Sequence, residues 1–190
     1  EEFLKSNFEY PVYCNLETKD YVIHKNKKPF ELKHFIEFPS EYESQTYEYL
    51  KVSDLFISAH YWDPSSPKIF TKEQMKEFLK LKIIGDITCD VDGSIPTTIK
   101  STTIEEPNFF LNTEIFSETD KADSNLAIMA VDNLPSELPR DSSTEFGNGI
   151  VNEVLPYILE EDDGRILNST IAAEGRFLKK YNYLNEYINS

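Results

Sequence analysis

The sequence has 190 residues, of which 39% are hydrophobic, and its formal net charge is −15. It is long enough to bury one core, and no apolar run is long enough to span a bilayer, so we expect a soluble protein. The excess of acidic residues argues against nucleic-acid partners and against an anionic membrane surface, since both require basic patches.

The N-terminal residues and the cysteines indicate a cellular compartment. Residues 1–5 are acidic and lack the apolar segment of a signal peptide. Cys14 and Cys89 are far apart, which favours two free thiols in a reducing cytosol over a disulfide framework. We therefore expect a cytoplasmic protein. Because no initiator Met is present, we also expect the chain to be a fragment.

Residues 1–53 are weakly patterned. Residues 10–14 are compatible with a short strand, 25–29 form a basic turn, and 39–43 are compatible with the start of a short helix. His24 and His34 lie in this region, and we assign them no role. An apolar run at 54–59, followed by a turn rich in proline, predicts a buried strand.

Two further strands are predicted after this one. Thr71 and Gln74 form a capping box that predicts a helix of about ten residues ending near Leu81. Strands at 82–88 and 126–131 then complete a right-handed β-α-β pattern, and their apolar runs predict parallel strands buried on both faces. Residues 99–125 suggest an excursion of short strands and turns.

Two helices are predicted near the C-terminus. Apolar residues recur at helical spacing over 140–160, where Pro156 should kink or break the helix. A final helix is expected over 179–188. Its aromatic side chains are better explained by packing than by cofactor binding.

Polar residues follow the second and third predicted strands directly. The first segment, 85–94, reads GDITCDVDGS, and the second, 130–143, reads AVDNLPSELPRDSS. In a parallel α/β sheet, ligands bind at the carboxyl ends of the strands, so these segments predict a ligand crevice. The alternative is two ordinary turns, because Asp, Asn, Ser and Pro are common turn residues.

Both segments resemble one family. DITCDVDGSI is similar to the D-I-x-x-D-x-G-G stretch of alanine dehydrogenases and of the lysine-ketoglutarate reductase and lysine-forming saccharopine dehydrogenase group. The segment from Ala130 is similar to their V-x-N-[ML]-P-x-x-x-P motif and the long helix after it. The resemblance covers roughly residues 40–190 and is stronger to the saccharopine dehydrogenase side.

The resemblance implies an α/β fold with an incomplete, Rossmann-type parallel sheet and a helical C-terminal extension. Residues 1–135 would form the distal part of a dinucleotide-binding domain. Residues 136–190 would form a helical segment that packs on the N-terminal substrate domain in relatives.

The sequence contains no G-x-G-x-x-G turn for a dinucleotide pyrophosphate. In the resembled family this turn lies upstream, as do the Lys and His that act as general acid and base. We therefore expect the C-terminal half of a larger enzyme, inactive by itself. The acid that would distinguish NAD from NADP is missing or lies at Glu1 or Glu2.

Asp90 is the candidate catalytic residue, because it occupies the position of the family's acidic residue beside the nicotinamide and the substrate amine. A carboxylate there can stabilise a cationic amine or imine. Asp86 is a candidate cofactor-binding residue, and four-residue spacing on a strand would place it on the same side as Asp90. Both carboxylates have a structural alternative: a cap of its own turn for Asp90, and a buried hydrogen-bond acceptor for Asp86.

Three more residues are candidates for cofactor binding. By resemblance, Asn133 would face the nicotinamide carboxamide and Leu134 would supply an apolar wall to the ring. Asn133 is equally compatible with a helix N-cap before Pro135. His60 follows the first predicted strand, where relatives approach the adenosine half, although a lone His is more often structural. No His, Cys and Asp cluster has metal-ligand spacing, so we expect no metal.

The resemblance implies an NAD(P)-dependent oxidoreductase that acts on the C–N bond of a small substrate derived from an amino acid. A different possibility is a non-catalytic, oligomeric binding or assembly module. Half a Rossmann sheet leaves strand edges and an apolar face unpaired, so a homo-oligomer is expected in either case.

Overall fold

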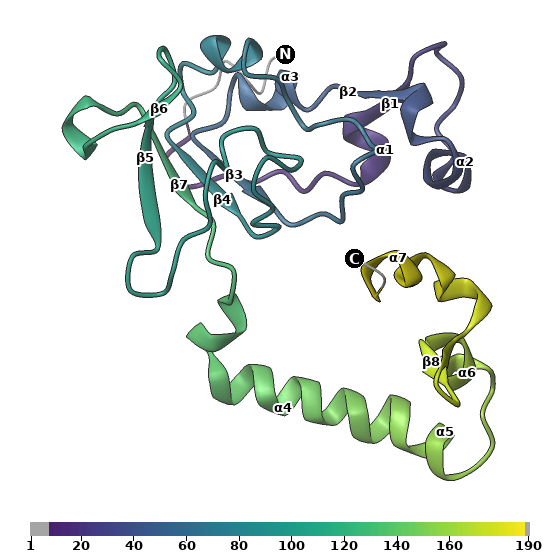
Figure 1. Ribbon diagram of the computed structural model, residues 1–190. Helices are drawn as coiled ribbons and strands as arrows, with labels where there is room; N and C mark the ends of the chain where they lie inside the picture. The colour runs from purple at the N-terminus through teal and green to yellow at the C-terminus, as the bar shows by residue number, and fades with distance from the viewer. Residues whose placement is uncertain (1–7, 189–190) are drawn as a thin grey trace. The chain divides into compact units, whose positions relative to one another are not determined.

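The structure is a computed structural model that describes residues 8–188 in two compact units. The first unit ends at Leu134, and the second begins at Pro135. Figure 1 labels their helices and strands. Glu1 and Glu2, the residues nearest to the expected ribose-binding position, lie outside the described residues.

A five-stranded sheet with the strand order β3-β4-β7-β5-β6 forms the centre of the first unit. Its strands are β3 (Leu55–Ser58), β4 (Ile83–Asp86), β7 (Leu126–Met129), β5 (Asn108–Asn112) and β6 (Ser117–Glu118). β3, β4 and β7 run parallel, whereas β5 pairs antiparallel with β7 and β6. The α/β class with a partial Rossmann-like sheet is confirmed, but the sheet is mixed, because the 99–125 excursion adds two antiparallel strands.

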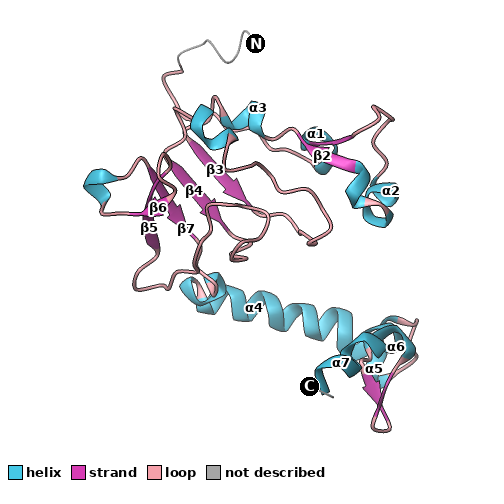
Figure 2. Ribbon diagram, turned by 45° about the horizontal axis from the view of Figure 1, so that its top comes forward, coloured by secondary structure: helices cyan, strands magenta, loops and turns pink. Residues whose placement is uncertain are grey.

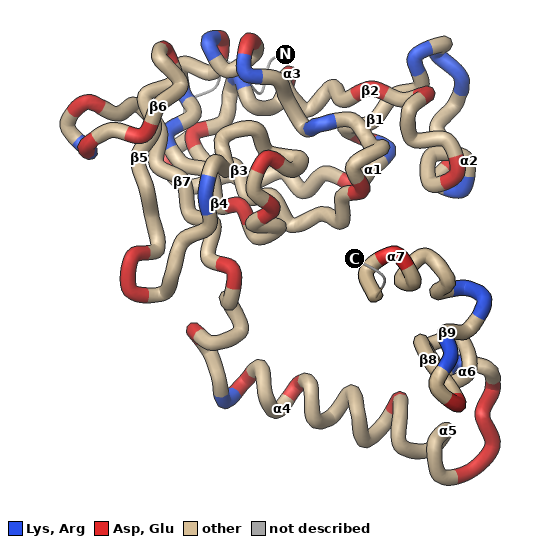
Figure 3. The backbone as a smooth tube through the Cα atoms, viewed as in Figure 1, with Lys and Arg blue, Asp and Glu red and all other residues tan. Residues whose placement is uncertain are grey.

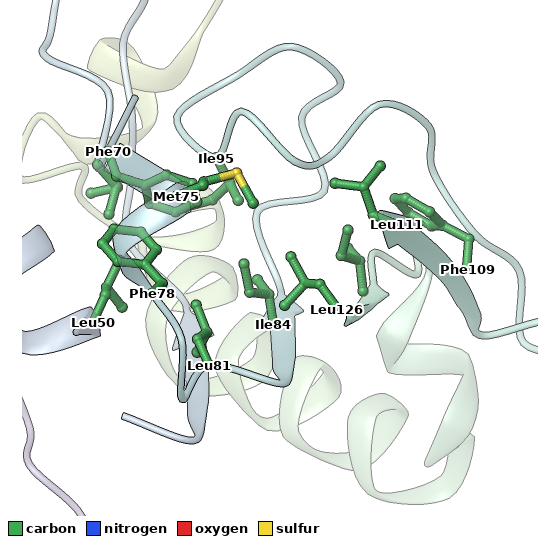
Figure 4. Packing of buried hydrophobic residues seen from close by; sticks show 12 residues of the cluster. Leu50, Phe70, Met75, Phe78, Leu81, Ile84, Ile95, Phe109, Leu111 and Leu126 are labelled. Atoms are coloured by element: carbon green, nitrogen blue, oxygen red, sulfur yellow. The ribbon is translucent and has the colours of Figure 1, made fainter. Parts of the chain in front are cut away.

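One face of this sheet is covered by a single hydrophobic core. Phe56, Ile84 and Ile128 lie side by side in the register of β3, β4 and β7, and the last two are fully buried. Figure 4 shows how side chains from the connecting segments pack over them. These are Leu50, Ile69, Phe70, Met75, Phe78, Leu81 and Ile95.

The opposite face of β3 and β4 is exposed among the described residues. Leu55 and Ile57 are 51% and 59% exposed, and Ile83 is 47% exposed. The expectation that these strands are buried on both faces is therefore wrong. The connections before and after β4 place their apolar residues on the face of Ile84, which leaves the other face uncovered.

The capping box is present, but the helix that follows it is short. The Thr71 amide donates to Gln74 Oε1 (2.8 Å), and the Gln74 amide donates to Thr71 Oγ1 (3.2 Å). The helical segment is only a 3₁₀ turn, Gln74–Glu77, because Phe78 leaves helical geometry with φ −87° and ψ 56°. Phe78 and Leu81 are buried in the core, so packing overrides the local helix signal here.

The chain before β3 forms a second, two-stranded sheet in which β1 pairs antiparallel with β2. Its elements are α1 (Thr18–Tyr21), β1 (Val22–His24), α2 (Leu32–Glu37), the 3₁₀ turn Pro39–Glu41, β2 (Tyr42–Ser44) and α3 (Tyr47–Leu50). The basic turn at 25–29 is exposed, as predicted. The predicted strand at 10–14 is wrong: within residues 8–188 this segment pairs with no strand, and Tyr13 is almost wholly exposed.

The second unit is mainly helical, as Figure 2 shows. It contains α4 (Pro139–Gly149), a π-helical segment (Ile150–Val154), α5 (Leu155–Leu159), α6 (Arg165–Ser169), the hairpin β8 (Ala172–Ala173) and β9 (Arg176–Phe177), the 3₁₀ helix Lys179–Leu184 and α7 (Asn185–Ile188). Pro156 has no amide hydrogen for the preceding turn, which explains the predicted break. The final helix is largely 3₁₀ rather than α. Within residues 8–188, no helix is long and apolar enough to cross a bilayer.

We predict that the two faces of β4 differ sharply in their contribution to stability. Ile84→Ala should lower the free energy of unfolding by about 2–5 kcal/mol, because it removes a fully buried side chain from the core. Ile83→Ala, on the exposed face of the same strand, should lower the free energy of unfolding by about 1 kcal/mol or less. Urea denaturation of both variants measures this difference, and equal losses would contradict the one-sided core.

Candidate functional site

The carboxyl ends of β3, β4 and β7 meet at one edge of the sheet, because these three strands are parallel. His60 follows β3, Cys89 and Asp90 follow β4, and Asp132 follows β7. Asp86 and Asp90 both act electrostatically on His60 and on Cys89, and Asp132 also acts on Cys89. The structure therefore brings these side chains into one electrostatic neighbourhood at the predicted crevice.

Asp86 is the structural centre of this neighbourhood. Its side chain is 0% exposed at the end of β4. Asp86 Oδ1 accepts hydrogen bonds from the Thr88 amide (3.1 Å) and from Thr88 Oγ1 (2.5 Å). Asp86 Oδ2 accepts one from Thr98 Oγ1 (2.5 Å). One buried carboxylate thus fastens both ends of the loop that carries Asp90.

Asp90 does not continue the strand, so the premise that it lies on one strand with Asp86 is wrong and strand spacing does not place the two on one face. β4 ends at Asp86, and the loop then turns through two left-handed residues, Cys89 (φ 49°) and Asp92 (φ 56°). Left-handed residues other than glycine carry strain and cluster at functional sites. Asp90 lies between these two residues, with an exposed side chain.

Gly93 closes the turn around Asp90. Its amide donates to the Asp90 carbonyl oxygen (2.9 Å). A Cβ atom at position 93 would lie 2.5 Å from Asp90 Cβ and 2.8 Å from the Asp90 carbonyl oxygen, so only glycine fits without displacing Asp90. The backbone therefore fixes the position of Asp90 from both sides.

His60 is half-buried and only partly hydrogen-bonded. Its Nδ1 lies 3.1 Å from Ser58 Oγ, whereas its buried Nε2 has no partner among the described residues. Burial lowers the pKa of His60, and the carboxylates of Asp86 and Asp90 oppose this shift without cancelling it. The environment thus favours the neutral imidazole, whose buried Nε2 is left without a hydrogen-bond partner among the described residues.

The environment of Cys89 favours the thiol over the thiolate. Burial raises the pKa of Cys89, and the carboxylates of Asp90, Asp86 and Asp132 raise it further. A thiolate is the reactive form of cysteine, so this site suppresses nucleophilic chemistry at Cys89. The same negative potential favours a cationic ligand.

Asn133 and Leu134 lie at the adjacent strand end, beyond β7. Asn133 is exposed and Leu134 is half-buried, at the start of the 3₁₀ turn Leu134–Glu137. Thr102 holds the chain just before them: its amide donates to the Ala130 carbonyl oxygen (2.9 Å), and the Ala130 amide donates to Thr102 Oγ1 (3.1 Å). The end of β7 is therefore fixed, and both candidates are accessible to a ligand.

Sequence reasoning missed two features of this site. Thr98, twelve residues from Asp86, carried no signal, because nothing local indicates that its hydroxyl reaches a buried carboxylate. Asp132 was visible in the AVDN motif, but its electrostatic effect on Cys89 depends on the pairing of β7 with β4.

We predict that Thr98 contributes measurably to stability and its neighbour Thr97 does not. Thr98→Val removes the hydroxyl that donates to buried Asp86 Oδ2, at nearly constant side-chain volume. The free energy of unfolding should therefore fall by about 1–3 kcal/mol. Thr97 is equally buried, but its hydroxyl has no partner among the described residues, so Thr97→Val should be neutral or stabilising. Chemical denaturation compares the two, and equal effects would refute the fastening role of Asp86.

Comparison with known proteins gives the family. Residues 15–181 match the model of the alanine dehydrogenase/PNT C-terminal domain. The chain is 29% identical to alpha-aminoadipic semialdehyde synthase of Arabidopsis thaliana. The match covers 92% of this chain and 18% of the Arabidopsis protein. The chain is 29% identical to the NAD(+), L-lysine-forming saccharopine dehydrogenase of Schizosaccharomyces pombe over 54% of its length, and 27% of that protein is covered.

Alanine dehydrogenase 2 of Staphylococcus aureus is 30% identical over 58% of the chain and 26% of that protein. The chain thus spans about a fifth to a quarter of the length of these curated relatives. The family model covers most of the chain, including β3, β4, β7 and the segments that follow them. The chain therefore belongs to the alanine dehydrogenase/PNT C-terminal domain family.

Proposed function

We propose that this chain is part of an NAD(P)-dependent oxidoreductase that acts on the C–N bond of a substrate derived from an amino acid. The family and the dehydrogenases among its relatives support this class of reaction. The observation that carries the proposal is the group of carboxylates at the ends of the parallel strands, where α/β sheets bind ligands.

Asp90 is the residue we assign to the reacting C–N centre. Its carboxylate is exposed, whereas its backbone is held by Gly93 and by the loop that Asp86 fastens. A fixed anion beside a substrate nitrogen stabilises the cationic amine or imine and holds a proton at that nitrogen. Asp86 itself serves this site through the loop rather than by touching a ligand.

The cofactor residues fit a nicotinamide in part. The exposed amide of Asn133 offers both a donor and an acceptor for a carboxamide, and Leu134 offers an apolar surface for a ring. The nicotinamide supplies hydride chemistry when bound. No Gly-rich turn of the kind that binds phosphate occurs in these 190 residues, so they do not supply this means of binding the cofactor pyrophosphate.

Saccharopine or a similar amino-acid conjugate is the substrate class we favour. The relative from Schizosaccharomyces pombe is named as an NAD(+)-dependent, lysine-forming saccharopine dehydrogenase, and the Arabidopsis relative matches nearly the whole chain. Both NAD and NADP remain compatible with the described residues. His60, half-buried just after the end of β3, is the candidate contact to the adenosine half of either cofactor.

A second candidate function is a non-catalytic assembly module. The exposed Leu55, Ile57 and Ile83 on one sheet face favour it, and among described residues 135–188 no side chain is buried. Apolar surfaces of this kind mark interaction sites, so on this view the chain forms a homo-oligomer. Sedimentation of the chain at about 50 µM tests this candidate, and a result that shows only monomer would count against it.

We predict that Asp90→Asn in the full-length enzyme lowers kcat by about a hundredfold or more, the scale of one lost preorganised charge. Asn keeps the size of Asp90 and its turn chemistry but removes its charge, so the loss isolates electrostatics. Steady-state kinetics with the saccharopine or lysine couple, together with the melting temperature, measure this effect.

Asp92→Asn is the matched control, because Asp92 lies in the same loop but in a left-handed turn position that Asn also tolerates. We expect near-normal kcat for this variant. Near-normal turnover and an unchanged melting temperature in Asp90→Asn would leave Asp90 as a turn residue only.

We also predict that this 190-residue chain by itself has no dehydrogenase activity, because it lacks the Gly-rich turn and the family's Lys and His pair. Absorbance at the NAD(P)H band with saccharopine, lysine plus 2-oxoglutarate, or alanine should not change above background. Titration calorimetry with NAD and NADP should show weaker binding to this chain than to the full-length enzyme. Turnover by the chain alone would refute the prediction.

A further inference from the structure

The small sheet before β3 contains a second cluster of polar side chains, separate from the strand ends. β1 ends at His24, α2 carries His34, and Glu41 immediately precedes β2. Figures 1 and 2 show β1, β2 and α2 gathered in one part of the first unit. Three residues that are 10 and 7 positions apart in sequence therefore meet in space.

Tyr42 is the centre of this part of the fold. It is 2% exposed, and its ring lies 5.0 Å from the His24 ring and 5.8 Å from the His34 ring, measured between centroids. Phe30 and Phe35 pack on its other edges, at 6.0 and 5.2 Å. The two imidazoles are thus held by aromatic packing rather than left mobile on the surface.

We propose that His24, His34 and Glu41 bind one divalent transition-metal ion, for which Zn²⁺ is the best match. Their potential ligand atoms, one from each residue, all lie within 4.8 Å of one another. Two imidazoles and one carboxylate are a frequent zinc ligand set that leaves one coordination position open. The Glu41 side chain is 44% exposed, which gives the ion a path from solvent.

His34 is suited to metal binding by its contact with Tyr42. Its Nδ1 lies 3.0 Å from Tyr42 Oη. When Nδ1–H donates to this hydroxyl oxygen, the lone pair of the neutral ring lies on Nε2, which is then the nitrogen that can bind an ion. Metal-binding histidines commonly donate their other ring N–H in this way, which orients the ring.

His24 must change its proton position to bind the ion. The Asn26 amide donates to His24 Nδ1 (3.0 Å), so the neutral ring carries its proton on Nε2 and donates it to Glu41 Oε2 (3.1 Å). Metal binding at Nε2 moves the ring proton to Nδ1 and breaks the bond from Asn26, which lies in an exposed turn. We therefore expect a dissociation constant of about 1–10 µM, weaker than a preformed structural zinc site.

The test is titration of the full chain with ZnCl₂ in the presence of excess Mg²⁺, which occupies nonspecific carboxylate sites. Calorimetry should show one site per chain, and Co²⁺ should give the visible absorption of a four-coordinate ion with nitrogen ligands. His34→Ala and Glu41→Gln should each weaken binding about tenfold or more. His24 is left unchanged, because its burial makes a folding defect the expected result.

Matched controls separate this site from general metal binding. Glu43→Gln removes an exposed carboxylate two residues from Glu41, and His60→Ala removes a histidine outside the cluster. Both should bind Zn²⁺ as the unmodified chain does. Circular dichroism of each metal-free variant checks that the fold is intact.

The result that would contradict the proposal is an adventitious ion only, that is, Zn²⁺ bound without a specific site. It would appear as Zn²⁺ binding that all four variants share, or as binding that excess Mg²⁺ abolishes. Either result, or no binding up to about 100 µM Zn²⁺, a concentration tenfold above the expected dissociation constant, overturns the proposal. The cluster would then be a hydrogen-bonded pair, His24 and Glu41, beside a packed His34.

Discussion

The buried carboxylate of Asp86 is the interaction on which the arrangement of the strand ends depends. It lies where β4 ends, and its two oxygens accept from Thr88 at the start of the following loop and from Thr98 near the end. An unpaired charge at this depth would be strongly destabilising, so the loop must supply these donors when the chain folds. The conformation of this loop is therefore required for burial of Asp86 and is coupled to the folding of the core.

This fastening explains how an exposed Asp90 can hold a defined position. The chain between Thr88 and Thr98 turns sharply, with two left-handed residues and a glycine that closes on Asp90. Such a loop has little intrinsic preference for one conformation. Asp86 and the Gly93 turn restrict it, so a carboxylate can face solvent or a ligand without the flexibility usual for a surface loop. The nearby carboxylates give this edge of the sheet a negative potential.

The sheet itself is built on one side only. The connections around β4 supply the core over Ile84 and leave Leu55, Ile57 and Ile83 exposed. Figure 3 shows a continuous acidic run at 160–163, between α5 and α6, and a basic group formed by the lysines of the turn at 25–28. Uncovered apolar faces of this kind commonly mark interaction surfaces. The same feature supports both candidate functions, because a longer enzyme chain or a second copy would each cover it.

The sequence by itself determined those features that depend on a few neighbouring residues. Strands β3, β4 and β7, the capping box at Thr71, the break near Pro156 and the polar segments at the strand ends were all predictable, because apolar runs, cap hydrogen bonds and the missing amide of proline act locally. The motifs around Asp90 and Asn133 also indicated the family. The roles of these two residues stay predictions.

Only the tertiary structure decided which residues meet and which faces are covered. The helix expected to reach Leu81 is a short 3₁₀ turn because Phe78 and Leu81 are drawn into the core. Strand spacing does not relate Asp90 to Asp86, because β4 ends at Asp86, whose carboxylate bonds Thr98 twelve residues away. His24, His34 and Glu41 come together only through the pairing of β1 with β2. Each outcome depends on contacts between segments distant in sequence, and local patterns carry no information about such contacts.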